Sequence, residues 1–158
     1  PIDAPDIMPT LLGLCSLDIP ESTEGRDWSP YFRDECELTG DEAALISMPA
    51  EYHELRYHGL KAFRGLRTIR YTYVRNIDGP WLLYDNTDDP YQMKNLIENR
   101  DFKKIQVDLD KRLQQRLEKQ KDKFLEGKAY LKRDGLLHYY EANVNCAKQW
   151  KDPWTSDS

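Results

Sequence analysis

The sequence RGLRTIRYTYVRNIDGPWLLYDNTDDPYQMKNL, residues 64–96, decides the fold of this chain. Its first part, residues 66–76, is rich in β-branched and aromatic side chains, which suit a pleated and half-buried surface. Residues 76–80 favour a turn, because glycine supplies a positive φ and proline fixes its own φ. A second short apolar run follows at 81–84. The stretch therefore predicts a β-hairpin.

Alternation along the first predicted strand assigns its side chains to two faces. It places Arg67, Ile69, Tyr71 and Tyr73 on one face, and the even-numbered residues on the other. After the second strand comes a cluster of cap and turn residues at 85–90. Asp89 as N-cap, with proline at the first helical position, predicts that a helix begins there.

A long amphipathic helix is predicted over residues 101–126, with Asp101 as its N-cap. One face carries apolar residues at steps of three, four and seven, and the opposite face is charged or polar. This apolar stripe consists of Phe102, Ile105, Leu109, Leu113, Leu117 and Phe124. We expect the stripe to pack on a sheet of three or four strands, since a lone hairpin is marginal in water. Residues 43–48 and the region of Leu137 are the candidate additional strands.

The N-terminal region predicts a helix over residues 7–15, with Asp6 as its N-cap. Pro9 falls in the first turn, where its missing N–H costs nothing. Met8, Leu11, Leu12 and Cys15 recur at helical spacing and are expected to form a buried face.

Composition limits the possible functions of the chain. It has 158 residues and a net charge of −5, from 28 acidic and 23 basic residues, so it lacks the basic excess typical of nucleic-acid binding. The sequence has no run of about 18 apolar residues, so it predicts no transmembrane helix. The cysteines are three in number and widely spaced, which indicates free thiols rather than a zinc site.

Two motifs carry a family resemblance. The first is DIMPTLLGL at residues 6–14, followed by Ile19-Pro20 and Gly25-Arg26-Asp27, and the second is the stretch at 64–96. In this order they resemble the C-terminal portion of arylsulfatase-type sulfatases of the alkaline-phosphatase superfamily. The resemblance implies an α+β fold: a small antiparallel sheet packed by a long C-terminal helix, plus an N-terminal helix belonging to the parent's large α/β domain.

The resemblance also implies a division of the chain. Residues 1–42 would end the large sulfatase α/β domain, residues 43–126 would form the C-terminal subdomain, and residues 127–158 would be an extension. We expect the larger, N-terminal portion of such a protein to lie upstream of Pro1.

The chemistry of this family requires a formylglycine, made from a Cys or Ser two residues before Pro with Arg two residues after it, and a divalent cation, usually calcium. The pentapeptide is not found at Cys15, Cys36 or Cys146. The paired carboxylates Asp88 and Asp89 are better explained by capping. We therefore expect no catalytic and no metal-binding residue in this chain, and place formylglycine and calcium in the N-terminal part.

The resemblance implies that the segment before the RGLR strand approaches the mouth of the active site. Its cationic and imidazole side chains suit an anionic or sugar substrate, because guanidinium groups bind oxyanions bidentately and imidazole exchanges protons near neutral pH. A solvated, charged loop is the alternative. The candidate substrate-binding residues are His53, Arg56, His58, Lys61 and Arg64.

Three functions remain open from the sequence. In the first, the chain is the C-terminal part of a sulfuric ester hydrolase; it completes the fold and the substrate pocket and is inactive alone. In the second, it belongs to a phosphonate or phosphate ester hydrolase of the same superfamily. In the third, it is a non-catalytic binding module on this fold. Expected partners are the N-terminal sulfatase portion, or a second copy through residues 7–15, and a sulfated small molecule or sugar. Neither nucleic acid nor a membrane is expected.

Overall fold

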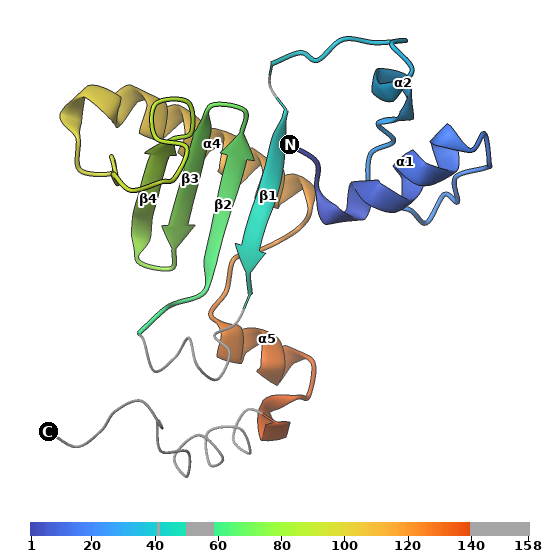
Figure 1. Ribbon diagram of the computed structural model, residues 1–158. Helices are drawn as coiled ribbons and strands as arrows, with labels where there is room; N and C mark the ends of the chain where they lie inside the picture. The colour runs from blue at the N-terminus through green and yellow to red at the C-terminus, as the bar shows by residue number, and fades with distance from the viewer. Residues whose placement is uncertain (41, 50–58, 140–158) are drawn as a thin grey trace, which may run out of the picture.

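The computed structural model describes residues 1–40, 42–49 and 59–139. Its centre is a four-stranded antiparallel sheet in the order β1-β2-β3-β4, in which each strand pairs with its neighbour in sequence. The strands are β1 (Ala43–Met48), β2 (Phe63–Thr68), β3 (Tyr71–Asn76) and β4 (Gly79–Asp85). The long helix α4 (Lys103–Lys119) crosses one face of this sheet (Figure 1). The predicted α+β fold is confirmed.

The run at 66–76 is two strands and not one. Thr68 closes a tight turn, since its hydroxyl accepts from the Tyr71 N–H at 2.8 Å and donates to the Tyr71 carbonyl at 3.0 Å. Leu66 therefore pairs with Tyr73, so the two side chains lie on the same face. The predicted assignment of faces is wrong, because alternation alone does not detect a turn without glycine or proline.

The hydrophobic core lies between the sheet and α4. Leu66, Tyr73 and Leu83 project from the sheet toward the helix, and Tyr73 and Leu83 are fully buried. The Tyr73 hydroxyl donates to Asp110 of α4 at 2.8 Å, which satisfies its polar atom. The helix contributes the predicted stripe through Leu109, Leu113 and Leu117. This packing confirms the predicted position of the helix on the sheet.

Both ends of the predicted long helix are wrong. The 3₁₀ turn η2 (Arg100–Phe102) precedes α4, and Asn99 caps it by accepting from the Asp101 N–H at 3.0 Å. The helix ends at Lys119, and Lys121 and Phe124 then take positive φ values of 57° and 46°. Phe124 reaches the core from this irregular segment. The periodic series of apolar residues therefore extends beyond the end of the helix, which is why the predicted helix is too long.

The predicted helix at Asp89 is absent, because residues 86–99 form turns. Asp89 accepts from the Lys94 N–H at 2.7 Å, as a cap does, but no helix follows. Asn95 instead accepts from the Leu83 N–H at 3.0 Å, and the Leu96 N–H donates to the Leu83 carbonyl at 2.7 Å. These bonds hold the segment beside β4. Hydrogen bonds to Leu83 of β4 thus replace the bonds that a helix at Asp89 would form.

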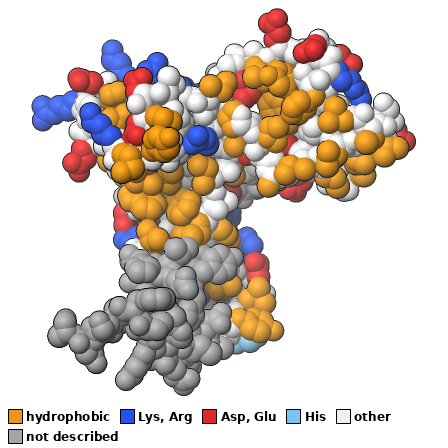
Figure 2. Space-filling model, viewed as in Figure 1, with side chains coloured by type: hydrophobic (Ala, Val, Ile, Leu, Met, Phe, Trp, Pro, Cys, Tyr) orange, Lys and Arg blue, Asp and Glu red, His pale blue; other side chains and the backbone are white. Residues whose placement is uncertain are grey.

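The N-terminal lobe contains η1 (Ala4–Asp6), α1 (Ile7–Leu14) and α2 (Ser29–Phe32). Asp6 does not cap α1; its carboxylate accepts instead from the Arg26 N–H and the Trp28 indole, both at 2.8 Å. The face of α1 that is expected to pack on the parent's large domain is open in this chain, since Met8 and Leu11 are 52% and 57% exposed. Figure 2 shows hydrophobic side chains gathered over this lobe.

The chain after α4 leads to a further short helix, α5 (Gly127–Arg133). Residues 137–139 are helical, so the region of Leu137 does not add a strand to the sheet. Of the helices that the structure describes, none combines the length and apolar character needed to cross a membrane.

Candidate functional site

Four of the five candidate substrate-binding residues belong to the connection between β1 and β2. Of these, His53, Arg56 and His58 lie outside the described residues. The structure places Lys61 just before β2 and Arg64 within it, as the second residue of the strand. These two residues have opposite environments.

Lys61 is exposed beside the β3–β4 turn. Its ammonium group forms an ion pair with Asp78, and the two side chains are 49% and 62% exposed. An exposed pair of this kind contributes little to stability, because water and salt screen it. Lys61 is therefore able to exchange Asp78 for another anion at little cost.

Arg64 is buried, and its guanidinium group is occupied by protein atoms. Its Nε donates to Asp122 at 2.6 Å, and Nη1 donates to the carbonyls of Met48 and Phe63 at 3.2 and 2.9 Å. The guanidinium carbon also lies 4.9 Å from the centre of the Phe124 ring. The predicted substrate contact of Arg64 stays untested, but these bonds give this side chain a structural role.

Asp122 and Tyr130 complete the surroundings of Arg64. Burial alone raises the pKa of Asp122, but hydrogen bonds from Arg64, Tyr130 and the Phe124 N–H outweigh it and hold that pKa below its usual range. Burial, and next the hydrogen bond to Asp122, raise the pKa of Tyr130. The site is therefore an ion pair with a neutral phenol. Sequence periodicity gave no signal for it, because the partners are far apart in the chain.

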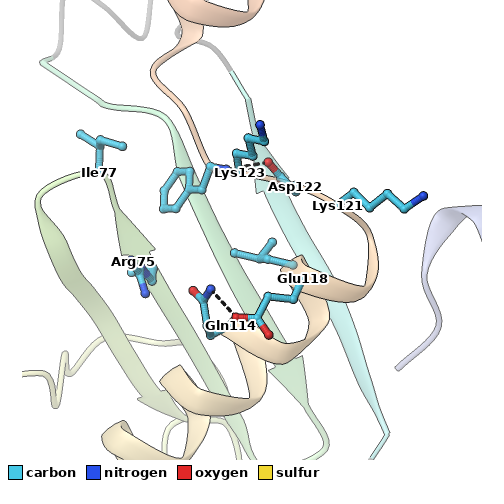
Figure 3. Close-up of a pocket in the computed structure, with 9 residues that line it drawn as sticks. Arg75, Ile77, Gln114, Glu118, Lys121, Asp122 and Lys123 are labelled. Atoms are coloured by element: carbon cyan, nitrogen blue, oxygen red, sulfur yellow. Dashed lines mark hydrogen bonds between the residues drawn. The ribbon is translucent and has the colours of Figure 1, made fainter.

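A cavity of about 450 Å³ opens beside this cluster, between the end of α4 and β3 (Figure 3). Part of its polar wall is paired: Gln114 donates to Glu118 at 3.0 Å, and the Nη1 atom of Arg75 contacts Asp110 at 3.2 Å. Leu117 and Phe124 supply apolar wall. The residues that line the cavity include no Ser, Thr, Cys or His.

Within residues 1–40, 42–49 and 59–139, no group of three or more His, Cys, Asp and Glu side chains is placed to hold a metal ion. Asp85 and Asp89 accept backbone N–H bonds, which accounts for the turn chemistry predicted for them. Cys15 and Cys36 are free and exposed. Ser47 does stand two residues before a proline, but Glu51 occupies the position of the required arginine.

Stability should depend on pH through Glu42 at the start of β1. Its carboxylate accepts from the Thr39 and Gly40 N–H groups at 2.7 and 2.9 Å, and the Thr39 hydrogen bond is the largest cause that lowers its pKa from 4.5 to about 2. This depressed pKa stabilises the fold above pH 4.5, and the contribution disappears as pH falls toward 2. We expect the melting temperature of Glu42→Gln to lie below that of the wild type at pH 6 and to converge with it near pH 2. A constant difference across that range would contradict this assignment.

Comparison with known families identifies the class of protein. The family described as "N-sulphoglucosamine sulphohydrolase, C-terminal" matches residues 2–120. The chain belongs to this family of sulfatase C-terminal domains, as the two sequence motifs implied.

Individual sulfatases agree with this assignment. An ulvan-active sulfatase from Formosa agariphila is 38% identical over 133 residues, which cover 84% of this chain and 25% of that protein. A solved 2-O GAG sulfatase has a TM-score of 0.63 and 25% identity, over 75% of this chain and 25% of that chain. A third protein, solved with its substrate D-glucosamine-2-N,6-O-disulfate, has a TM-score of 0.59 and 26% identity, over 75% of this chain and 24% of that chain. The chain thus spans about a quarter of these relatives.

Phosphonate hydrolases are more distant. The phosphonate monoester hydrolase of Agrobacterium radiobacter has a TM-score of 0.51 and 24% identity, over 70% of this chain and 23% of that chain. This similarity shows a shared fold, and the sequence similarity favours the sulfatases.

Proposed function

We propose that this chain is the C-terminal part of a sulfuric ester hydrolase that acts on a sulfated sugar. It completes the fold and one wall of the substrate pocket, and it is inactive alone. The observation that carries the proposal is the 38% identity with an ulvan-active sulfatase over 84% of the chain. The solved relative with its disulfated glucosamine substrate supports a sulfated sugar rather than a simple aryl ester.

The described residues do not fit the cofactors of this chemistry. Formylglycine requires the pentapeptide that the sequence lacks, and the carboxylates of Asp85 and Asp89 are engaged by backbone N–H groups. We therefore assign formylglycine and calcium to a sulfatase portion outside this chain. Residues 1–42 would complete its large domain, residues 43–126 would form the subdomain, and residues 127–158 the extension.

The substrate wall is assigned to the β1–β2 connection. His53, Arg56, His58 and Lys61 supply cations and imidazoles in one short segment, and the Lys61 ammonium group forms an exposed ion pair with Asp78. Arg64 belongs to the same predicted set, but its donors are already used by protein acceptors. We therefore propose that the first four contact substrate.

Sulfate release tests the proposal. We expect the complete protein that contains this chain to release sulfate from ulvan oligosaccharides or a sulfated glucosamine, and this chain alone to release none. Arg56→Ala and His58→Ala should each raise KM about tenfold or more, since a hydrogen bond to a charged group is worth roughly 1.5–3 kcal/mol. Tyr91→Ala, at an 86% exposed side chain of the 86–99 turns, is the matched control and should leave KM unchanged.

Three outcomes would contradict the proposal or part of it. Hydrolysis of a phenyl phosphonate ester without sulfate release would favour the phosphonate hydrolase alternative. Binding of a sulfated sugar without any hydrolysis would favour the binding module. If Arg56→Ala and His58→Ala had the same KM as the wild type, the β1–β2 connection would not form the wall of the substrate pocket.

A further inference from the structure

The β1–β2 connection is fastened at its neck, where β1 ends and β2 begins. Met48 and Phe63 pair across this neck in the sheet. The Nη1 atom of Arg64 bonds to the carbonyl oxygens of both, at 3.2 and 2.9 Å. One buried guanidinium group thus joins the two ends of the connection.

The guanidinium group is in turn held by the segment that follows α4. Its Nε donates to Asp122 at 2.6 Å, and Nη2 lies 3.4 Å from the Tyr130 hydroxyl. That hydroxyl donates to Asp122 at 2.6 Å and accepts from the Leu125 N–H at 3.0 Å. Each of the three guanidinium nitrogens therefore has a partner, and each partner is itself hydrogen-bonded.

The backbone turns sharply after α4. Lys121 ends the helix in a Schellman motif, in which its N–H donates to the Glu118 carbonyl at 3.0 Å and the Asp122 N–H donates to the Leu117 carbonyl at 2.9 Å. Phe124 also takes a positive φ, of 46°, which is unfavourable for a residue with a side chain and is not part of that motif. The turn brings Asp122 into contact with Arg64. It leads into α5, which lies below the end of β1 and the start of β2 in Figure 1. Asp122 and Tyr130 also lie beyond residues 2–120, the part matched by the family. The unfavourable φ of Phe124 occurs where its N–H donates to Asp122 at 2.8 Å, which indicates that the contacts of Asp122 hold the segment in place.

We propose that residues 121–130 form a clamp on the neck of the β1–β2 connection, with Arg64, Asp122 and Tyr130 as positioning residues. The clamp fixes the direction in which the chain leaves β1 and re-enters β2. It thereby fixes both ends of the segment to which the proposed function assigns sugar binding, and the inference rests on that function. Binding residues on a loop need such support, because a loose second layer of contacts lowers affinity.

Two tyrosines provide a matched test. Tyr130→Phe removes a hydroxyl that donates to Asp122 at the neck, and Tyr73→Phe removes one that donates to Asp110 at 2.8 Å, away from the neck. Hydrogen exchange is measured on the full chain, for peptides covering residues 46–49 and 59–65. We expect Tyr130→Phe to accelerate exchange there about fivefold or more, since it removes a bond to a charged group. Tyr73→Phe should leave exchange at the neck unchanged.

A measurement of KM distinguishes a role of Tyr130 in positioning the binding segment from a role in stability alone. In the complete sulfatase, Tyr130→Phe should raise KM for the sulfated sugar about threefold or more, while Tyr73→Phe lowers the melting temperature without changing KM. Unchanged exchange at the neck, or equal acceleration by both variants, would overturn the clamp. Acceleration by Tyr130→Phe with an unchanged KM would overturn the positioning role. Absence of sulfate release by the wild type would overturn the proposed function, whereas the exchange result does not depend on it.

Discussion

Replacing Arg64 by methionine should lower the free energy of unfolding by about 3 kcal/mol, because removal of one partner leaves a partly buried charge uncompensated. The Arg64 and Asp122 side chains are only 3% and 21% exposed. The substitution also leaves the carbonyls of Met48 and Phe63 without the Nη1 donor. Chemical denaturation of the wild type and the variant gives this difference directly.

Two further variants separate charge from packing. Arg64→Met combined with Asp122→Asn should recover more than half of the loss, because the amide removes the unpaired charge and keeps an acceptor for Tyr130. Arg133→Met breaks an exposed pair with Asp134 and should cost at most about 0.5 kcal/mol. A loss below about 1 kcal/mol for Arg64→Met would show that water reaches Asp122 and replaces the pair.

The parts of the fold that follow from side-chain periodicity were predictable. The stripe through Leu109, Leu113 and Leu117 lies on the sheet because a helix period of 3.6 places these residues on one side. The strand at 43–48 agrees with the observed β1 (Ala43–Met48). The prediction of this strand rests on a continuous apolar run that Pro49 ends, and not on periodicity.

The errors arise where a side chain bonds to a distant part of the chain. Asp6 precedes a helix, as a cap should, yet its carboxylate is used by Trp28 across the lobe. Asp89 has the sequence of a helix start, but Leu96 returns to β4 through the Leu83 carbonyl. Such choices depend on which donors tertiary structure brings close, and local sequence does not encode that proximity.

The same limit applies to the candidate site. The sequence grouped Arg64 with Lys61 because both are cations before or within the basic strand. Burial separates them, since Arg64 has 2% of its surface exposed and Lys61 remains in solvent. The partner that decides the environment of Arg64, Asp122, stands 58 positions further along the chain. The burial of Arg64 therefore becomes visible only in the three-dimensional structure.

The exposed apolar face of α1 predicts that the isolated chain associates with a second copy of itself through Met8 and Leu11. Met8 and Leu11 are 52% and 57% exposed, and Ile7 and Leu14 beside them are also open. In the proposed sulfatase this face packs on the large domain; in the isolated chain it is free to pack on a second copy. Exposed apolar clusters of this kind mark contact surfaces.

Met8→Ser combined with Leu11→Ser should therefore weaken self-association of the chain about 100-fold or more, because burial of each side chain contributes roughly 1.5–3 kcal/mol. The free energy of unfolding should change by less than about 0.5 kcal/mol, as expected for exposed positions. Val107→Ser, at a 59% exposed residue of α4, is the control and should leave association unchanged. Light scattering over a concentration series measures the effect. A wild-type chain that stays monomeric at high concentration would contradict self-association and leave the N-terminal sulfatase portion as the only proposed partner of this face.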